Sequence, residues 1–371
     1  MSINTSIFAD ALIANFGFFA GVPDSLLKDF CAALNDKLSP DKFVTTVNEG
    51  SAVAMCAGYT LATGLPGVVY MQNSGLGNAI NPLLSLNDAL VYRIPVLLVI
   101  GWRGEPDVKD EPQHKKQGLV TRELLNVCGI PWRVLSDVAD IKWAYNEFEK
   151  NNSPVAILVK KDAFSKYEKI YTNKNELARE AAIEAVIDSL NCDYRIVSTT
   201  GMISRELYAL REKRGESHNR DFLTVGAMGH SSAISLGLAM SLPDTKIICF
   251  DGDGAVLMHM GAMATIGSLK VKNLIHVVFN NEAHDSVGGQ ATVAGNVNLT
   301  EIAKSCGYSS ACCVKNVMDL KNAVSVGCVE EGLHFIEIKV ALRTDTDLMR
   351  PSDDLENLKN AFSKLKKEAD K

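Results

Sequence analysis

The sequence lacks the features typical of proteins that bind nucleic acid or insert into a membrane. No run of Lys and Arg precedes the C-terminal tail, and the net charge of the 371 residues is -6, so binding to a nucleic-acid backbone is not expected. The longest aliphatic run, residues 94–101, is far too short to cross a bilayer. Residues 1–10 contain neither a basic segment nor a long apolar core, so we expect no signal peptide and no membrane span.

Cysteine spacing of the kind that holds a metal is also absent. The nine cysteines are an odd number, and only Cys312 and Cys313 are adjacent. We interpret them as reduced thiols in cores or helices, which predicts a cytoplasmic protein. The length favours roughly two domains, and hydrophobic and charged fractions of 47% and 22% are those of an ordinary soluble protein.

The chain does contain a strand, turn, helix and strand in succession. Residues 247–250 and 274–279 are short apolar runs typical of buried strands, and residues 255–270 are long enough for a helix and a return. In such a parallel crossover both strands end at the same edge of the sheet, where ligands bind. The turns that follow the two strands are therefore expected to lie close together.

These turns carry residues suited to a phosphate and a hard cation. Gly252 and Gly254 allow the backbone to approach a phosphate closely, and the helix that starts at Ala255 adds N–H groups and a favourable dipole. Asp253 and Asn281 offer a carboxylate and an amide oxygen, a sparse oxygen set that suits Mg2+ held jointly by protein and diphosphate. A lone Gly-Asp-Gly is usually only a turn and a lone Asn pair only a loop, so the prediction rests on their occurring together.

Together they resemble the signature of the thiamin diphosphate enzymes. The resemblance implies that Asp253 and Asn281 bind Mg2+ and that the main-chain carbonyl of Ala283 completes the set. It also implies that thiamin diphosphate is the cofactor. The residues then expected to contact its diphosphate at this edge are Gly252, Gly254, Ala255 and Asn281.

Two further turns fit the same cofactor. One follows an expected strand at residues 194–198 and consists of Thr200, Gly201 and Met202. Its hydroxyl and its glycine lie at the start of an expected helix, which suits phosphate oxygens. Met228 lies in a Gly-x-Met-Gly turn, where methionine is more often core filling. The resemblance implies instead that the Gly226 carbonyl receives the amino group of the cofactor ring and that Met228 wedges the cofactor into its bent form.

Glu49 is the strongest catalytic candidate. It follows a short β-rich run, residues 43–47, and precedes a helix of small residues, 51–62. A carboxylate at a helix start is often only a partner of the helix dipole. The resemblance implies that Glu49 hydrogen-bonds to the aminopyrimidine ring of the cofactor and so promotes proton transfer.

The two halves of the chain repeat one order of features. Each has a small-residue helix, a Pro-containing turn, a strand and a glycine-bearing turn, which predicts two related domains. We therefore expect an α/β protein with two doubly wound parallel-sheet domains and no central third domain. The predicted division is a pyrimidine-binding domain at 1–165, a linker at 166–175 and a diphosphate- and Mg2+-binding domain at 176–371.

Substrate contacts are expected from the ends of the first-half strands. Asp24 and Ser25 either cap a second helix or face the substrate, and Asn73 and Ser74 are expected to line the substrate cavity. Residues 103–118 read as a loop of sixteen residues with charges of both signs, which is long for a compact domain. Its candidates for neutralising a dianionic substrate are Arg103, Lys109, Lys115 and His114, and His114 is also a candidate for proton transfer near neutral pH.

Within the thiamin diphosphate enzymes, five segments resemble the phosphonopyruvate decarboxylases: residues 21–27, 70–78, 101–106, 110–114 and 281–290. The resemblance implies decarboxylation of 3-phosphonopyruvate to phosphonoacetaldehyde, a step towards 2-aminoethylphosphonate. It also implies a homodimer or higher homo-oligomer with active sites between subunits. Sulfopyruvate or another 2-oxo acid remains an alternative substrate.

Two other classes fit the sequence less well. A regulatory subunit that only binds the cofactor would have no need of Glu49. A dinucleotide-binding dehydrogenase would need Gly-x-Gly-x-x-Gly, and Gly252-Asp253-Gly254 is followed by Ala255, Val256 and Leu257.

Overall fold

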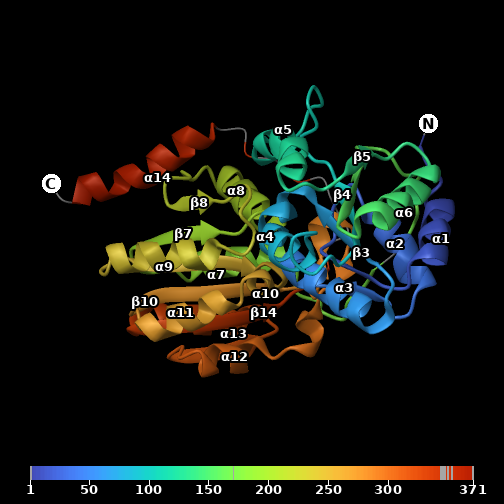
Figure 1. Ribbon diagram of the computed structural model, residues 1–371. Helices are drawn as coiled ribbons and strands as arrows, with labels where there is room; N and C mark the ends of the chain where they lie inside the picture. Colours follow the sequence, from blue (N-terminus) through green and yellow to red (C-terminus); the bar gives the residue numbers. More distant parts are fainter. Residues whose placement is uncertain (1, 170, 343–347, 349–350, 352–353, 370–371) are drawn as a thin grey trace. The chain divides into compact units, whose positions relative to one another are not determined.

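The computed structural model describes residues 2–169, 171–342, 348, 351 and 354–369. The chain divides into two compact units, residues 1–171 with 286–291 and residues 172–285 with 292–371. Residue 170 of the expected linker and residues 343–347, 349–350, 352–353 and 370–371 of the expected second domain lie outside the described residues. Figure 1 shows helices on both faces of the sheet in each unit.

The first unit is built on a parallel sheet of order β2-β1-β3-β4-β6-β5. Its strands are β1 (Phe19–Gly21), β2 (Phe43–Thr45), β3 (Gly67–Gln72), β4 (Val96–Gly101), β5 (Trp132–Val134) and β6 (Val155–Val159), with β12 (Gln290–Ala291) apart from the sheet. Its helices are α1 (Thr5–Asn15), α2 (Lys28–Lys37), α3 (Glu49–Thr63), α4 (Leu76–Pro82), α5 (Pro112–Val127) and α6 (Ala139–Asn151).

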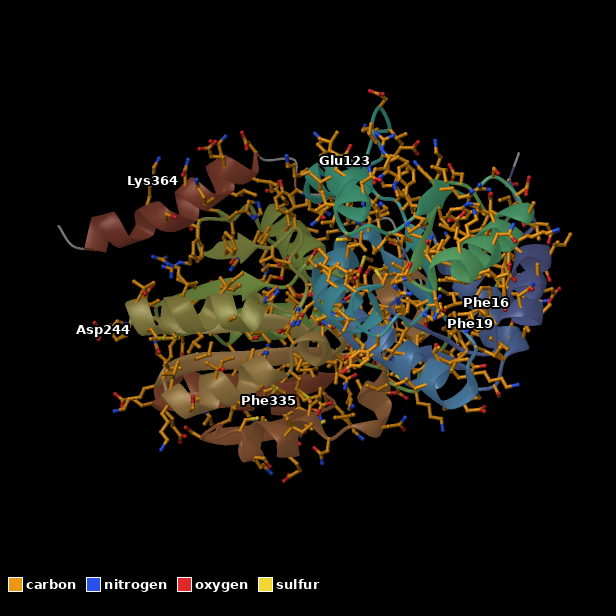
Figure 2. All side chains as sticks on the ribbon, in the orientation of Figure 1. Phe16, Phe19, Glu123, Asp244, Phe335 and Lys364 are labelled. Carbon is orange, nitrogen blue, oxygen red and sulfur yellow. The ribbon has the colours of Figure 1, made fainter. Side chains whose placement is uncertain are left out.

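Both faces of this sheet are buried, which explains the uninterrupted apolar runs of its strands. In β3, Val68 and Tyr70 join one core with residues of α1, α2 and α6, whereas Val69 and Met71 join a second core with residues of α3, α4 and α5. Successive side chains of a strand point to opposite faces, so a strand covered on both sides must be apolar at every position. Phe16 and Phe19, labelled in Figure 2, belong to the first of these cores.

The second unit has a parallel sheet of order β13-β14-β10-β9-β7-β8. Its strands are β7 (Tyr194–Ser198), β8 (Asp221–Leu223), β9 (Lys246–Gly252), β10 (Asn273–Asn280), β13 (Ser310–Val314) and β14 (Gly332–Lys339), with the short β11 (Ala283–His284) apart from the sheet. Its helices are α7 (Arg179–Asp188), α8 (Met202–Arg214), α9 (Ser231–Ser241), α10 (Asp253–Met258), α11 (Gly261–Leu269), α12 (Leu299–Ser305), α13 (Val317–Val329) and α14 (Leu355–Ala369). Among the described residues, none of the helices is both long and apolar enough to traverse a membrane.

The two sheets share one topology. Read from its β8 edge, the second sheet has the order second, first, third, fourth, sixth, fifth strand, which is the order of the first sheet. The predicted α/β class and the two doubly wound parallel sheets are therefore confirmed. The repeated order of features in the sequence reflects this duplicated topology.

The structure differs from the sequence expectations at two places. Capping of the second helix was one of the two alternatives for Asp24 and Ser25, but α2 begins at Lys28 after Leu27. The Asp24 carboxylate instead accepts the Leu26 N–H at 2.8 Å and so closes a tight turn before the helix. The loop expected at 103–118 is also shorter, because α5 begins at Pro112. Proline is favourable in the first turn of a helix, where its missing N–H would have no partner in any case.

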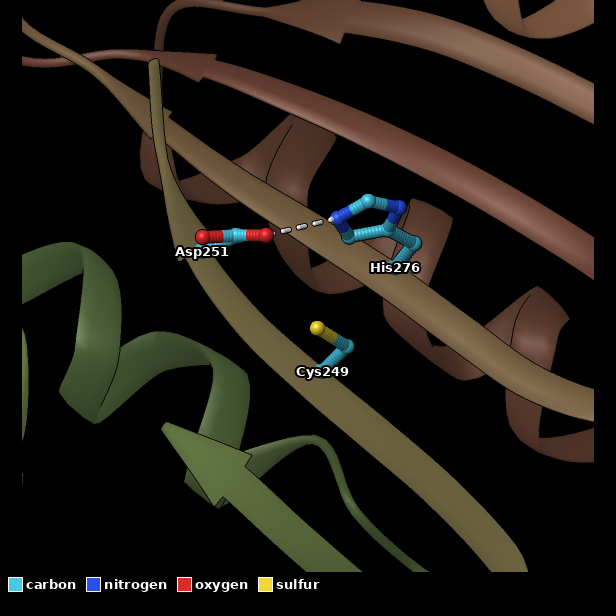
Figure 3. A group of neighbouring side chains, drawn as sticks. All are labelled: Cys249, Asp251 and His276. Carbon is cyan, nitrogen blue, oxygen red and sulfur yellow. Dashed lines mark ion pairs between the residues drawn. The ribbon is translucent and has the colours of Figure 1, made fainter. Parts of the chain in front are cut away.

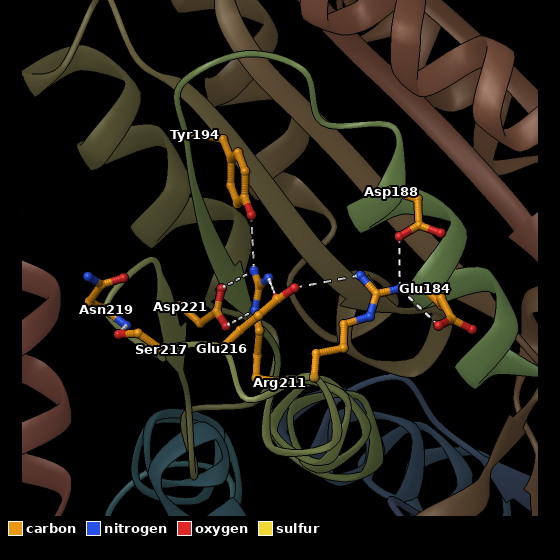
Figure 4. A network of polar contacts seen from close by, with 9 residues as sticks. Glu184, Asp188, Tyr194, Arg211, Glu216, Ser217, Asn219 and Asp221 are labelled. Carbon is orange, nitrogen blue, oxygen red and sulfur yellow. Dashed lines mark hydrogen bonds and ion pairs between the residues drawn. The ribbon is translucent and has the colours of Figure 1, made fainter.

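A buried ion pair joins α8 to β8 in the second unit (Figure 4). Arg211 donates from Nε and Nη2 to the two carboxylate oxygens of Asp221 at 2.8 and 3.0 Å, and the side chains are 4% and 0% exposed. The same guanidinium also donates to Glu216 at 2.6 Å and to the Tyr194 hydroxyl at 3.2 Å. All of its charge is thus compensated inside the unit.

Arg211→Ala is expected to lower the free energy of unfolding by about 3–5 kcal/mol, because it leaves the Asp221 carboxylate buried without its cation. Urea denaturation followed by circular dichroism measures the change. Lys272→Ala, which breaks an ion pair whose side chains are both 75% exposed, is the control and is expected to cost at most about 1 kcal/mol. Equal effects of the two substitutions would contradict a structural role for the buried pair.

Candidate active site

The predicted metal ligands follow neighbouring strands of the second sheet. Strand β9 ends at Gly252 and α10 begins at Asp253, while β10 ends at Asn280, one residue before Asn281. The two strands pair in parallel, with Gly252 opposite Phe279. Their carboxyl ends therefore meet at one edge, and the side chains of Asp253 and Asn281 are each only 3% exposed.

The environment of Asp253 fits a bound cation. Burial raises the pKa of this carboxyl to about 7, against the opposing effect of the Thr292 hydroxyl and of the backbone N–H groups of Gly254 and Asp253 itself. The Thr292 hydroxyl donates to Oδ2 at 2.5 Å. A carboxylate this deeply buried is stabilised by a nearby cation, so the donor set suits Mg2+. Thr292 was not predicted, because a contact between residues 39 positions apart leaves no local signal.

The paired asparagines have different tasks. The Asn280 amide is used inside the protein, since it donates to Glu337 Oε1 at 2.7 Å and accepts the Glu282 N–H at 2.9 Å. Asn281 accepts the Ala283 N–H at 3.2 Å through Oδ1, which leaves this oxygen a second lone pair for a metal. Glu282 has a positive φ of 61°, so the chain turns sharply between Asn281 and Ala283.

The predicted diphosphate contacts lie at the same edge. Strand β7 pairs with β9, and Thr200 and Gly201 follow its end, with Gly201 as the N-cap of α8 at φ 96°. A Cβ on Gly254 would lie 3.1 Å from His284 Cε1 and 3.4 Å from Met228 Cε. The backbone at Gly254 is therefore closely surrounded, as a turn that cradles a phosphate requires.

The turn that carries Gly226 and Met228 connects β8 to α9. Ala227 and Gly229 both have positive φ, 52° and 83°, so the chain makes a sharp bend around Met228. The Met228 side chain extends to the Gly254 turn. The structure thus brings the predicted Met228 next to the predicted phosphate turn, within the second unit.

Glu49 is held by the first unit alone. It is the first residue of α3, and its N-cap Asn48 accepts the Gly50 N–H at 2.8 Å. The Glu49 side chain is largely buried, which raises the pKa of its carboxyl, and Asn78 opposes this shift by donating to Oε2 at 2.8 Å. The partner Asn78 lies in α4 and was not predicted to touch Glu49.

Gly75 supplies the space that Glu49 occupies. A Cβ at Gly75 would lie 2.5 Å from Glu49 Oε1 and 2.6 Å from its Cγ, whereas a Cβ at Gly77 would meet nothing within 4 Å. The two glycines are two residues apart, so they form a matched pair for mutation.

Given the predicted catalytic role of Glu49, Gly75→Ala is expected to displace the Glu49 carboxylate and to lower turnover by about 100-fold, as small misplacements of catalytic groups do. Gly77→Ala is expected to leave activity near that of the wild type. Steady-state rates with saturating cofactor measure both. Similar rates for the two variants would show that the position of Glu49 does not depend on Gly75.

Three of the predicted substrate residues of the first unit, Asp24, Ser25 and Arg103, are held by side-chain hydrogen bonds. Asp24, fully buried, accepts Gln72 Nε2 at 2.6 Å, and burial raises the pKa of its carboxyl despite this bond. Ser25 Oγ accepts Arg103 Nη1 at 2.7 Å. Arg103 also forms a two-pronged ion pair with Asp110, in which Nε donates to Oδ2 at 2.8 Å.

Asp110 was not predicted, and it changes the interpretation of Arg103. The guanidinium does not face a substrate as a bare cation, because one carboxylate already compensates its charge. Asp110 further accepts the Gly104 N–H at 2.7 Å, so it also fixes the loop after β4. Arg103 is consequently rigid, which favours precise binding of an anion.

Other candidates from the sequence are placed differently. Asn73 is 2% exposed, and its amide donates to the Arg103 carbonyl at 2.8 Å and to Thr121 Oγ1 at 2.9 Å, so it holds the chain together. Ser74 is exposed and donates to Gln72 Oε1 at 2.7 Å. Lys109 and Lys115 are exposed.

His114 lies in the first turn of α5 and is only partly exposed. Burial, together with the positive charge of Arg103, lowers the pKa of its imidazole to about 4. The ring is therefore neutral at pH 7, which differs from the expected titration near neutral pH. A neutral imidazole donates or accepts a hydrogen bond and contributes no charge.

Comparison with known proteins places the chain in a family. Residues 5–124 match the family described as "Thiamine pyrophosphate enzyme, N-terminal TPP binding domain", and residues 197–338 match "Thiamine pyrophosphate enzyme, C-terminal TPP binding domain". A phosphonopyruvate decarboxylase of Streptomyces viridochromogenes is 34% identical over 355 residues, 90% of this chain and 87% of the relative. Another from Streptomyces hygroscopicus is 32% identical over 90% of this chain and 86% of the relative.

A sulfopyruvate decarboxylase of Methanosarcina acetivorans is also similar, with 29% identity over 72% of this chain and 73% of the relative. These matches agree with the duplicated α/β topology and with the donor set at the edge of the second sheet. The predicted resemblance to the phosphonopyruvate decarboxylases is confirmed. This chain belongs to the family of thiamin diphosphate-dependent carboxy-lyases that contains the phosphonopyruvate and sulfopyruvate decarboxylases.

Proposed function

We propose that this enzyme decarboxylates 3-phosphonopyruvate to phosphonoacetaldehyde and CO2 with thiamin diphosphate and Mg2+, as a step towards 2-aminoethylphosphonate. The observation that carries the choice of substrate is the similarity over 90% of the chain to two relatives named phosphonopyruvate decarboxylase. The named sulfopyruvate decarboxylase is less similar over a smaller share of the chain. The rigid Arg103 is consistent with an anionic substrate, because its planar guanidinium suits phosphonate oxygens.

In this proposal the second unit holds the metal and the diphosphate. Asp253 and Asn281, with the Ala283 carbonyl, provide oxygen ligands for Mg2+, and Thr292 orients the Asp253 carboxylate. The turns with Thr200, Gly201 and Met202 and with Gly252, Gly254 and Ala255 offer backbone N–H groups to phosphate oxygens. Thiamin diphosphate, when bound, supplies an electron sink for the pair left behind by departing CO2.

In the first unit Glu49 moves a proton. Asn78 already donates to Oε2, so Oε1 would be the oxygen that hydrogen-bonds to the cofactor ring. Because burial raises the pKa of this carboxyl, Glu49 is a better proton carrier near neutral pH than an exposed glutamate. Ser25 and Arg103 orient the substrate anion, and the neutral His114 contributes a hydrogen bond.

The choice among 3-substituted pyruvates is tested by competition. Equal concentrations of phosphonopyruvate and sulfopyruvate are supplied together, with thiamin diphosphate and Mg2+, and the two aldehydes are quantified by NMR. The proposal predicts that phosphonoacetaldehyde forms at least about 100-fold faster than the aldehyde from sulfopyruvate, as expected of a site whose polar groups discriminate between two anionic substrates. Preferential consumption of sulfopyruvate would assign the enzyme to the alternative substrate.

We also propose a homodimer or higher homo-oligomer with active sites between subunits, as the family resemblance implies. Large apolar side chains on α3 and on the loops after α3 and α4 are exposed, including Leu61 at 74% and Leu90 at 94%, and such a surface suits a protein partner. Mixing Glu49→Gln and Asp253→Asn subunits provides the test. If each site takes Glu49 from one subunit and Asp253 from the other, mixed dimers regain activity. If each site takes both residues from the same subunit, mixed dimers stay inactive.

A further inference from the structure

Three side chains with metal-binding atoms form a buried group on the second sheet (Figure 3). Cys249 and Asp251 are two residues apart in β9 and therefore lie on one face of the sheet. His276 in β10 is the register partner of Cys249. The three residues are 0%, 0% and 1% exposed, and they are distinct from the predicted Mg2+ ligands.

Two atoms of this group are buried without a hydrogen bond, Asp251 Oδ2 and His276 Nε2. Their other polar atoms are occupied, because Asp251 Oδ1 accepts the Gly252 N–H at 3.1 Å and His276 Nδ1 pairs with the Tyr308 hydroxyl at 3.1 Å. These two atoms, which lack a hydrogen bond, face one another at 3.4 Å and form an ion pair when the imidazole is protonated (Figure 3). This separation exceeds the range of about 2.7–3.2 Å that N–H···O bonds occupy.

The same separation suits two ligands of one metal ion. Two ligands at about 2.0–2.1 Å from a tetrahedral Zn2+ lie about 3.4 Å apart. One atom from each of the three side chains lies within 4.8 Å of the other two. Three atoms spaced in this way are all within about 2.8 Å of a common point, so inward shifts of less than about 1 Å bring them to zinc bonding distances.

We propose that Cys249, Asp251 and His276 bind one Zn2+ ion in a structural site. Thiolate sulfur, imidazole nitrogen and carboxylate oxygen are a donor set typical of zinc and unsuited to Mg2+. The carboxylate and the thiolate together balance the charge of the divalent ion, and the thiol proton passes to solvent when the metal binds. Ser235 of α9, whose buried hydroxyl adjoins the Cys249 thiol, is the candidate for the fourth position.

A zinc ion at this site would link β9 to β10 just before the carboxyl ends of the two strands. Asp251 is two residues before Asp253, and His276 is five residues before Asn281. Zinc would therefore fix the relative position of the two strands that carry the predicted Mg2+ ligands. This inference concerns a second metal and holds whichever acid the enzyme decarboxylates.

The test begins with the metal content of the full-length protein, purified without chelator and measured by elemental mass spectrometry. We expect about one zinc per chain in the wild type and a loss of at least tenfold in Cys249→Ser and in His276→Gln. Asp253→Asn and Cys313→Ser are the controls and should retain zinc, because the first removes a predicted Mg2+ ligand and the second an exposed thiol. Full zinc content in Cys249→Ser, or none in the wild type after loading, would overturn the proposal.

Cobalt substitution makes the test independent of variant folding. Wild-type protein is stripped of metal and reloaded with Co2+, and its absorption spectrum is recorded. A thiolate-to-cobalt charge-transfer band that saturates at one Co2+ per chain is expected. Absence of that band would overturn the proposal even if the substituted proteins failed to fold.

Discussion

Glu49→Gln is expected to lower kcat for decarboxylation by about 10²–10⁴-fold, the usual contribution of a positioned proton-transfer group. Glutamine has nearly the same shape and can still accept the Asn78 N–H that now reaches Oε2 at 2.8 Å. It cannot exchange a proton, so the chemical step is lost while the fold of the first unit is kept. Initial rates at saturating thiamin diphosphate and Mg2+ measure the effect.

Glu123→Gln is the matched control, since Glu123 is an exposed carboxylate in α5 of the same unit (Figure 2). Its rate should equal that of the wild type. If Glu49→Gln also kept the wild-type rate, Glu49 would have no part in proton transfer and the family's mechanism would not apply to this chain.

Asp253→Asn is expected to weaken Mg2+-dependent binding of thiamin diphosphate by at least about 100-fold. Removing a direct metal ligand is expected to lower the affinity more than removing a residue that only orients a metal ligand. The substitution removes the buried negative charge but keeps an oxygen that can accept the Thr292 hydroxyl. Isothermal titration of the protein with thiamin diphosphate in the presence of Mg2+ gives the dissociation constant directly, without reference to turnover.

Asp244→Asn serves as the control for this charge change. Asp244 is exposed and precedes β9 in the same unit (Figure 2). Its substitution therefore changes the net charge by the same amount as Asp253→Asn and leaves the carboxyl ends of β9 and β10 unaltered. Unchanged cofactor affinity in Asp253→Asn would mean that the metal is held elsewhere.

The sequence predicted the long strands, and that Asp253 and Asn281 lie at one edge of the sheet, because both leave local signals. The apolar runs that became β9 and β10 are bounded by glycine and asparagine, and parallel strands bring their carboxyl ends together by necessity. Glu49 was predictable for the same reason, as the carboxylate between a strand and a helix of small residues. These signals need only neighbouring residues in the chain.

Contacts between distant residues left no such signal. Thr292 bonds Asp253 from 39 positions away, and Asn78 bonds Glu49 from 29 positions away. Asp110 was closer to Arg103, but a stretch with charges of both signs does not reveal which residues pair. Cys249 and His276 meet only because β9 and β10 lie side by side, so cysteine spacing along the chain could not reveal them.

Short elements were the other source of error. Strands β1 and β8 have three residues each, too few to show a periodic pattern, and neither strand was predicted from the sequence. The start of α5 was missed because charged residues after a proline resemble a loop, although proline is favourable in the first turn of a helix.

We propose that this chain is a phosphonopyruvate decarboxylase that needs both thiamin diphosphate and Mg2+. The most direct measurement is phosphorus NMR of wild-type enzyme with 3-phosphonopyruvate, once with both cofactors and once with each omitted after chelation. We predict that the phosphonoacetaldehyde signal grows only in the complete mixture. Phosphonopyruvate left unchanged in the complete mixture, with the cofactor bound, would contradict the proposed function.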